Sequence, residues 1–261
     1  MKYRSILFAL AALCLSAAGA RAQVEVREAQ LPAGLSADVR QQVLALASKD
    51  AARRAQAACA LGEAGTEAVP AIPYLVALMG DGTPLAPSAL CKNAEPFEDE
   101  AWQPDFEQVY EPSPGEAATQ ALVALGAPAI EPLLDALKAP QWRTRKNAAW
   151  ALGHRGDERA TPLLADALKD EAWQVRCEAA YALSQRGGDR VLERLVAALK
   201  DEAWQVRAMA ALALGQKGDA RVLEPLRAAT RDRNRRVRAT ARMALQMKSG
   251  FTSGPSGRKG E

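Results

Sequence analysis

A ten-residue segment, ALKDEAWQVR, occurs twice without change, at 167–176 and at 198–207, and this repetition limits the folds open to the chain. The two copies begin 31 residues apart, and the register continues to Arg145 on one side and Arg238 on the other. A period of about 20 to 50 residues is typical of solenoids, in which each repeat is one small unit that stacks on the next. The sequence therefore predicts a stack of similar units.

Each unit combines two helical patterns. The first carries large aliphatic residues at helical spacing, as at Leu163, Leu164 and Leu168, and the second is rich in alanine, which lets helices approach closely. Glycines such as Gly65 and Gly156 follow the second pattern and are typical helix stops. A lone helical pair cannot bury its apolar stripe, so stability comes from stacking on neighbours. We expect an all-α fold, an α-solenoid of about six helical hairpins.

The N-terminus has the three parts of a secretory signal peptide. Lys2 and Arg4 precede an apolar run at 6–20, and small residues follow up to Ala22, where we expect cleavage. The run is shorter than the 20 or so residues of a spanning helix, although an uncleaved anchor is an alternative. We therefore expect export, to a periplasm or outside the cell. The predicted parts are a signal peptide at 1–22, a polar lead-in at 23–36, the solenoid at 37–248 and a disordered tail at 249–261.

Net charge gives no argument for a nucleic acid partner. The chain holds 34 basic and 31 acidic side chains, and three of the basic ones lie in the predicted leader, which has no acid. The mature chain is therefore nearly neutral, and nucleic-acid binding proteins usually show a strong basic excess. We expect no nucleic acid partner.

The second repeat is interrupted by an acidic, Pro-rich insertion at 82–115. It holds six prolines, seven acidic residues against the single Lys92, and four aromatic residues. Loops of this length are uncommon unless they are functional or disordered. The density of aromatic side chains favours a loop that docks on another surface.

The segments LKDEAWQVRCEAAYALSQRGGDRVLERL and LKDEAWQVRAMAALALGQKGDARVLEPL resemble HEAT-like repeats of the short type, about 31 residues long, of the phycobilin lyases. The resemblance covers 37–248 and is weak in repeat two, where Ala118 stands in the arginine position. It implies a right-handed superhelix whose second helices line the concave surface. The family includes adaptor scaffolds, chromophore lyase subunits and metal-dependent hydroxylases, and the hydroxylases hold iron with paired His-Glu motifs. Because His154 is the single histidine, we expect no metal site and no cofactor.

In each second helix, the positions that vary within the fixed frame are three or four residues apart and so share one helical face. By the resemblance, this face lines a concave groove. Aromatic and methionine side chains are enriched at protein interfaces, so we expect protein or peptide binding there; the alternative is that the side chains only pack the inner curve. No nucleophile or acid is visibly paired with His154, so no catalytic residue is expected. The candidate binding residues are Asn147, Trp150, His154, Glu178, Tyr181, Gln185, Met209, Leu212, Gln216 and Met243, and Thr240 and Met247 occupy the same positions in the last repeat.

Three cysteines remain after the predicted cleavage. Cys59 stands at the position equivalent to Trp150, and Cys91 lies in the insertion of the adjacent repeat. Because exported proteins form disulfides, we predict a Cys59–Cys91 bond that pins the insertion across one end of the groove. Cys177 is then the spare thiol.

Two further sets of residues recur with the repeat. We expect the arginines at the start of the second helices to form ion pairs and backbone contacts between repeats; the alternative is a row that grips an anionic partner. Tryptophans three residues earlier are expected to pack on the neighbouring turn. The sets are Arg54, Arg145, Arg176, Arg207 and Arg238, and Trp142, Trp173 and Trp204.

The last repeat is basic. A polar cap is the ordinary interpretation, because a terminal repeat has one face that no neighbour covers, and contact with an anionic membrane or an acidic partner is the alternative. Its arginines are Arg227, Arg231, Arg233, Arg235, Arg236, Arg238 and Arg242.

Together these patterns predict an exported, non-enzymatic scaffold, monomeric, that binds a protein or peptide along the concave face. The alternative is a subunit of a chromophore-lyase-like or other modifying enzyme, in which Tyr181, His154 and Cys177 would act chemically. The two classes differ in how they respond to mutation. An enzyme loses activity on a single polar substitution, whereas a scaffold loses affinity gradually along its surface.

Overall fold

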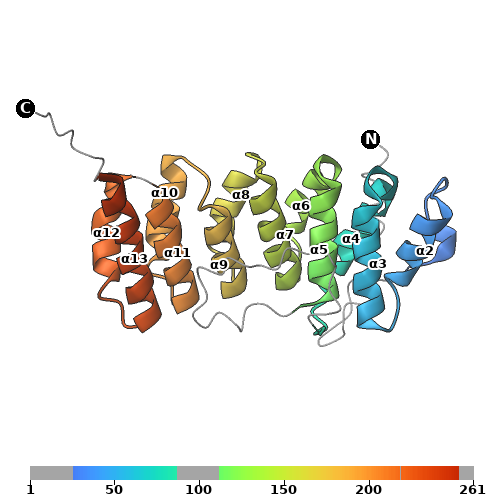
Figure 1. Ribbon diagram of the computed structural model, residues 1–261, viewed down its shortest axis with the longest axis horizontal. Helices are drawn as coiled ribbons and strands as arrows, with labels where there is room; N and C mark the ends of the chain where they lie inside the picture. Colours follow the sequence, from blue (N-terminus) through green and yellow to red (C-terminus); the bar gives the residue numbers. More distant parts are fainter. Residues whose placement is uncertain (1–25, 87–111, 218, 253–261) are drawn as a thin grey trace, which may run out of the picture. The chain divides into compact units, whose positions relative to one another are not determined.

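The computed structural model describes residues 26–86, 112–217 and 219–252. Every regular element in these ranges is a helix, as expected (Figure 1). The chain divides into two compact units, with the boundary after Ala151. Within the described ranges the helices pair into six hairpins, which confirms the predicted α-solenoid of helical hairpins.

The first unit contains hairpins one to three, and the boundary between the units falls inside the last helix of hairpin three. In this unit α3 packs against α2 and α5, and α4 packs on α5. The elements are the 3-10 helix η1 (Glu28–Gln30), α2 (Ala37–Ala45), α3 (Ala51–Glu63), the 3-10 helix η2 (Gly65–Ala71), α4 (Ile72–Leu78), α5 (Pro114–Leu125), the 3-10 helix η5 (Ala127–Ala129), α6 (Ile130–Ala136) and α7 (Trp142–Arg155).

The second unit contains hairpins four to six. Its second helices pack side by side, with α11 between α9 and α13, and each first helix packs on its own partner (Figure 1). The elements are α8 (Ala160–Ala167), α9 (Trp173–Ala182), α10 (Asp189–Ala198), α11 (Trp204–Gln216), the 3-10 helix η6 (Ala220–Val222), α12 (Leu223–Ala229) and α13 (Arg235–Thr252).

The core is built mainly from leucines and alanines of both helices in each hairpin. In the second unit Leu164, Leu183, Leu195 and Leu214 are fully buried. Burying one such side chain contributes about 1.5 to 3 kcal/mol. The aliphatic first helices and the alanine-rich second helices therefore supply the core that the sequence pattern predicted.

Second helices approach so closely that a Cβ would not fit at certain contacts. A Cβ built on Gly215 would lie 2.7 Å from the Cβ of Ala244, and one on Gly153 would lie 2.8 Å from the Cβ of Ala182. Contacts under 3.0 Å require the backbone to move. The glycine and alanine of the repeat therefore set the spacing between neighbouring second helices.

The recurring arginines join neighbouring repeats, as expected. Arg176 donates through Nε and Nη2 to the Asp201 carboxylate at 2.7 and 2.8 Å, and through Nη1 to the carbonyls of Asp170 and Glu171. Arg207 makes the equivalent bonds to Asp232 at 2.8 and 2.9 Å.

These bonds change the pKa of both kinds of partner. The hydrogen bond that Arg176 donates to Asp201 raises the pKa of Arg176 despite partial burial. The pKa of Asp232 is lowered, because the bonds from Arg207 and from the Asn234 N–H outweigh the effect of burial. Such pairs fix the register of one repeat against the next.

Two predicted boundaries differ from the structure. Helix α13 continues through Thr252, so residues 249–252 are helical although the sequence predicted disorder from 249. Extending an existing helix needs far less free energy than starting one, so even Gly/Ser-rich residues can follow. Helix α5 begins at Pro114 with Ser113 as N-cap, so the end of the predicted insertion is helical. The signal peptide, residues 87–111 of the insertion and residues 253–261 of the tail lie outside the described residues and stay predictions.

Candidate functional site

The predicted binding face is partly buried. Asn147, Trp150 and Leu212 are 6%, 9% and 7% exposed. Asn147 is held by a 2.9 Å bond from its Nδ2 to the carbonyl oxygen of Met79, so its amide serves the packing of the first unit. We therefore remove these three residues from the candidate binding surface, because buried side chains offer no contact area to a partner.

The accessible members lie mainly in the second unit. His154, Gln185 and Gln216 are exposed, and Met247 in the last repeat is 47% exposed, the one large hydrophobic side chain exposed among the described residues. These four positions are spaced by 31 residues. The remaining predicted members are half-buried. We call the set the second-helix strip, and it comprises His154, Glu178, Tyr181, Gln185, Met209, Gln216, Met243 and Met247.

The strip contains two contacts between side chains of successive repeats. The rings of His154 and Tyr181 lie 6.1 Å apart between centroids. Gln185 donates through Nε2 to Oε1 of Gln216 at 3.0 Å. Each amide has further donor or acceptor capacity beyond that bond. The strip therefore offers aromatic, thioether and amide groups, which suit a protein surface better than a charged small molecule.

One strip residue is not on a helix, contrary to expectation. Helix α9 ends at Ala182, so Gln185 lies in the turn that follows. The free carbonyls at this end accept hydrogen bonds from Lys217 instead, whose Nζ donates to Leu183 and Ser184 at 2.6 Å and also to Arg186. Ending the helix early thus creates acceptors that the next repeat satisfies.

Lys217 belongs to a second basic series that the sequence analysis missed. Arg186, 31 residues earlier, donates to the carbonyl oxygens of Leu152 and Asp157, both at 2.8 Å. Burial lowers the pKa of Arg186, and burial together with the Arg186 charge lowers the pKa of Lys217 to about 8. The signal was present in the sequence as a basic residue directly after each strip position, at 155, 186, 217 and 248.

The insertion leaves and rejoins the first unit at one place. Leu85 N–H donates to the Pro112 carbonyl at 2.8 Å, and Gly115 N–H donates to the Asp81 carbonyl at 3.0 Å. A Cβ on Gly115 would lie 2.6 Å from the Met79 oxygen, so this crossing requires glycine. Asp81 also pairs with Arg54 at 2.7 Å. The ion pair between a recurring arginine and the next repeat is therefore present here too, although the insertion follows directly.

Cys177 is a buried free thiol, 5% exposed, whose Sγ lies 3.9 Å from the Gln205 carbonyl oxygen. It is the cysteine predicted to be spare, and its Sγ faces the first turn of α11. Cys91 lies outside the described residues, so the Cys59–Cys91 bond stays a prediction.

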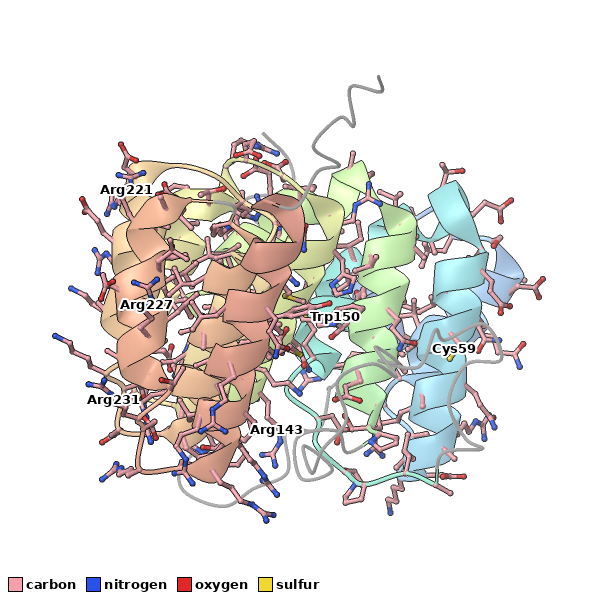
Figure 2. The ribbon with its side chains drawn as sticks, turned by 60° about the vertical axis from the view of Figure 1, so that its left-hand side comes forward. Cys59, Arg143, Trp150, Arg221, Arg227 and Arg231 are labelled. Carbon is pink, nitrogen blue, oxygen red and sulfur yellow. The ribbon has the colours of Figure 1, made fainter. Side chains whose placement is uncertain are left out.

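The basic residues of the last repeat spread over two surfaces. Arg227 and Arg231 are exposed on and just after α12, along with Arg221 of η6, and Figure 2 shows the three pointing away from the helices. Arg235 and Arg242 are exposed on α13. Arg238 is tied to the carbonyls of Asp232 and Arg233.

The tryptophan expectation holds at Trp204. The guanidinium of Arg236, from the first turn of α13 in the next repeat, lies 4.7 Å from the Trp204 ring centroid. This distance suits a cation–π contact. Trp204 therefore packs against the start of the next repeat's second helix rather than forming a free ridge.

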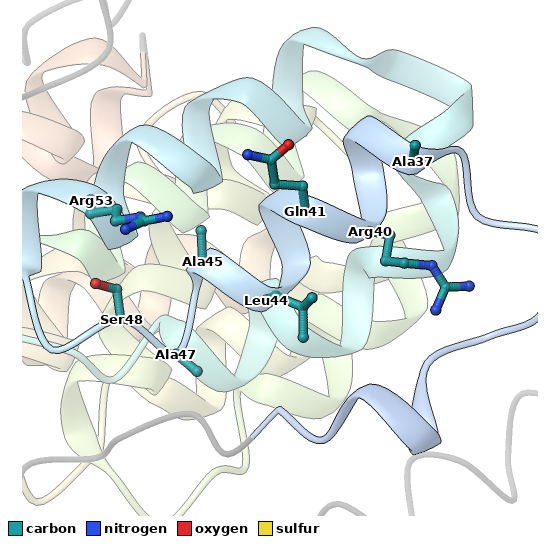
Figure 3. A pocket seen from close by; sticks show the side chains of 8 residues that line it. All are labelled: Ala37, Arg40, Gln41, Leu44, Ala45, Ala47, Ser48 and Arg53. Carbon is teal, nitrogen blue, oxygen red and sulfur yellow. The ribbon is translucent and has the colours of Figure 1, made fainter.

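A pocket of about 510 Å³ lies at α2 and the start of α3, lined by Arg40, Gln41, Leu44, Arg53 and small residues (Figure 3). Its few polar groups are dispersed, and it does not contain the strip. In the described ranges, no three His, Cys, Asp or Glu side chains gather as metal ligands would. None of the described helices combines the length and hydropathy that a membrane crossing requires.

Comparison with known proteins gives one family. The profile of the HEAT repeats family matches residues 112–184 and again 162–246, together more than half of the chain. No curated protein sequence matches.

Several solved structures share the fold. The complex of CpcE and CpcF of phycocyanin lyase from Nostoc sp. matches with TM-score 0.50 and 24% identity, over 68% of this chain and 99% of that one. Kap121p matches with TM-score 0.58 and 17% identity, over 81% of this chain and 25% of that one. Yeast importin-beta (Kap95p) matches with TM-score 0.56 and 15% identity, over 80% and 30%. This chain therefore spans less than a third of Kap121p or of importin-beta, and identities this low show the fold alone.

Proposed function

Because the chain belongs to the HEAT-repeat family, we propose that it is a non-enzymatic scaffold that binds a protein or peptide segment along the second-helix strip. The observation that supports this most is the series at 154, 185, 216 and 247, where an exposed side chain follows a buried alanine of the repeat by three residues each time. Exposed Met247 beside half-buried Met243 offers a partner a flexible apolar contact. The amides of Gln185 and Gln216 can form hydrogen bonds that fix the orientation of the bound segment.

The proposed location is outside the cytoplasm, in a periplasm or secreted. It is supported by the signal-peptide pattern of residues 1–22. Sequencing the N-terminus of the protein purified from its native exported fraction tests this part. A chain that starts at Gln23 supports it, and a chain that retains Met1 in the cytoplasm contradicts it.

Photo-crosslinking tests the binding function. A photoreactive amino acid replaces Gln216 in the strip or, as matched control, exposed Glu193 on α10. We expect illumination of the native exported fraction to give a protein adduct from position 216 and none from position 193. Equal adducts from both positions, or adducts from 193 alone, would contradict the proposal.

The competing function is a modifying enzyme that uses His154, Tyr181 or Cys177. Cys177 gives this little support, because a thiol that is 5% exposed cannot reach a macromolecular substrate without local opening. Circular dichroism of the variants His154→Ala and Tyr181→Ala must first show unchanged helicity. A modification of the crosslinked partner that disappears in one of these variants, while binding remains, would favour the enzyme.

A further inference from the structure

The first hairpin is hollowed on the side where the stack begins. Helix α3 is the second helix of this hairpin, and no other second helix precedes it in the described ranges. The pocket of about 510 Å³ at α2 adjoins another of about 340 Å³ that extends along α3 to Ala60. The two share Gln41, Ala45 and Arg53 (Figure 3). We call these two adjoining pockets the end groove.

Inside each unit, an alanine of one second helix receives the glycine of the second helix before it. A Cβ built on Gly62 would lie 2.9 Å from the Cα of Ala121, and one built on Gly215 would lie 2.7 Å from the Cβ of Ala244. Ala121 and Ala244 are 3% and 0% exposed. The alanine therefore marks the face of a second helix on which the preceding helix packs.

Helix α3 has such an alanine, although no helix covers it. Ala60 stands two residues before Gly62, as Ala213 stands two residues before Gly215. Ala213 is fully buried, whereas Ala60 is half-buried and lines the end groove. The end groove therefore keeps the face by which second helices pack inside the stack.

One residue of this face departs from the repeat. Arg53 stands seven residues before Ala60, and the same position in the second unit holds fully buried valines, namely Val175, Val206 and Val237. Arg53 is exposed, and Arg40 lies on the other side of Ala45 and Leu44 (Figure 3).

The two arginines of the end groove are not neutralised. Among the described residues, neither the Arg40 nor the Arg53 guanidinium has a hydrogen bond or an ion pair, and no acidic side chain lines the groove. A helix that covered Arg53 with apolar side chains would bury an unpaired charge, which is strongly unfavourable. A helix that packs here must therefore bring a carboxylate to Arg53.

We propose that the end groove receives one helix of another protein, which presents glycine or alanine to Ala60 and aspartate or glutamate to Arg53. This site lies outside the second-helix strip and goes beyond the function proposed above. Two observations select the occupant. The alanine face continues the contact by which second helices pack on each other, and a carboxylate is the group that pairs with a guanidinium through two parallel hydrogen bonds.

The last helix of a second copy of this chain is a poorer occupant. In α13, Gln246 stands 31 residues after Gly215, at the glycine position of the repeat. Its side chain would fill the space that close approach to Ala60 requires. Helix α13 also contains arginines and no acidic residue, and like charges repel across an interface. A helix with small and acidic residues meets both requirements.

The experiment is a selection from a phage library of helical peptides, randomised on one face, against the chain that starts at Gln23. We expect the selected helices to carry an acidic residue about seven positions, or two turns, from a glycine or alanine. A synthetic selected helix should bind the variant Arg53→Glu about tenfold or more weakly by fluorescence anisotropy, a loss of about 1.4 kcal/mol. The same helix with its acidic residue changed to lysine should regain affinity for Arg53→Glu.

Two matched controls accompany the variants. Lys49→Glu makes the same charge change at an exposed residue outside the groove, and we expect it to leave the affinity nearly unchanged. Ala60→Leu should prevent close approach and binding, whereas Ala77→Leu, at an exposed position of α4, should not. Circular dichroism verifies that all four variants remain helical. Equal losses in Lys49→Glu and Arg53→Glu would show long-range attraction only and would overturn the assignment to Arg53.

The remaining outcomes also decide the inference. A selection that yields no helix, or helices without acidic enrichment that bind Arg53→Glu as well as the parent, would overturn it. Loss of binding in Gln216→Ala/Met247→Ala would assign the selected helices to the strip and not to the end groove. Dimers seen by analytical ultracentrifugation that dissociate in both Arg53→Glu and Ala60→Leu would overturn it in favour of a second copy.

Discussion

Lys217 donates a hydrogen bond to the carbonyl oxygen of Leu183, 34 residues earlier in the chain, at 2.6 Å. Arg186 makes the same contact with Leu152 at 2.8 Å. A cation from each repeat thus closes the C-terminal end of the previous repeat's second helix, where free carbonyls and the helix dipole favour positive charge.

The contact at Lys217 predicts a pH effect. Burial and the nearby Arg186 charge lower its pKa from 10.5 to about 8, so between about pH 8 and 10.5 the unfolded chain holds more protons at this site than the folded chain. The free energy of unfolding should therefore rise with pH across that window, relative to Lys217→Met. Since the side chain is partly exposed, we expect a rise of the order of 1 kcal/mol.

Urea unfolding of the parent and of Lys217→Met at pH 7.5 and pH 9.5 measures this rise in the free energy of unfolding. These pH values lie about half a unit below and a unit and a half above the lowered pKa of Lys217. Subtracting the variant removes the contribution of other groups that titrate in the window. Parallel pH curves for the two proteins would show that Lys217 keeps an ordinary pKa.

Removing Arg176 should destabilise the second unit strongly. The variant Arg176→Ala leaves the Asp201 carboxylate, which is mostly buried, and two carbonyls without their donor. Loss of one partner of a buried pair lowers the free energy of unfolding by about 3 to 5 kcal/mol. Arg159→Ala is the control, because Arg159 is exposed and pairs with Asp157 at the surface, where the loss of an ion pair changes stability little. Similar losses measured by urea unfolding would refute the prediction.

The close approach of α11 and α13 predicts intolerance to a single methyl group. In Gly215→Ala the new Cβ would meet Ala244 at 2.7 Å, which forces the helices apart. We expect a loss of about 1 to 3 kcal/mol. Gly187→Ala is the matched control: nothing lies within 4 Å of its Cβ, and removing glycine from a compatible position is neutral or stabilising. Thermal unfolding should rank Gly187→Ala above Gly215→Ala, and the reverse order would contradict the helix spacing described here.

The cysteines predict a thiol count. If Cys59 and Cys91 are joined, alkylation of the natively exported chain under denaturing conditions without reductant should add one label, at Cys177. Because Cys177 is buried, the same reagent should add little label before denaturation. Three labels on the unfolded, unreduced chain would exclude the disulfide, and reduction beforehand gives the three-label reference.

The repeat register predicted which residues share a helical face, the pairing of the helices, and ion pairs of the recurring arginines between repeats, of which Arg176–Asp201 is one. It did not predict how far a neighbour covers that face. Trp150 and Tyr181 occupy the same position, yet Trp150 is buried and Tyr181 is half-buried. Periodicity gives the direction of a side chain, whereas exposure depends on tertiary packing.

The end of α9 was missed for a related reason. Ser184 stands where the neighbouring repeats have Gly153 and Gly215, and the helix stops at Ala182. Its carbonyls are satisfied by Lys217, a residue of the next repeat, so the local sequence alone did not reveal that end. The basic residues at 186 and 217 recur with the repeat in the sequence. Only the structure shows that they bind the carbonyl oxygens at the end of the previous second helix.

The fixed offsets within the repeat allow the chain to change length without redesign. Deleting residues 177–207 would join one copy of the ten-residue segment to Ala208. Arg176 would then stand 25 positions before Asp232, the offset at which Arg207 now binds it, and Gly153 would meet Ala213 in place of Ala182. Unequal exchange between the gene segments that encode the two identical ten-residue copies would produce this protein or its longer counterpart in one step. Copy number is therefore a variable on which selection can act, and the length of the binding surface would follow it.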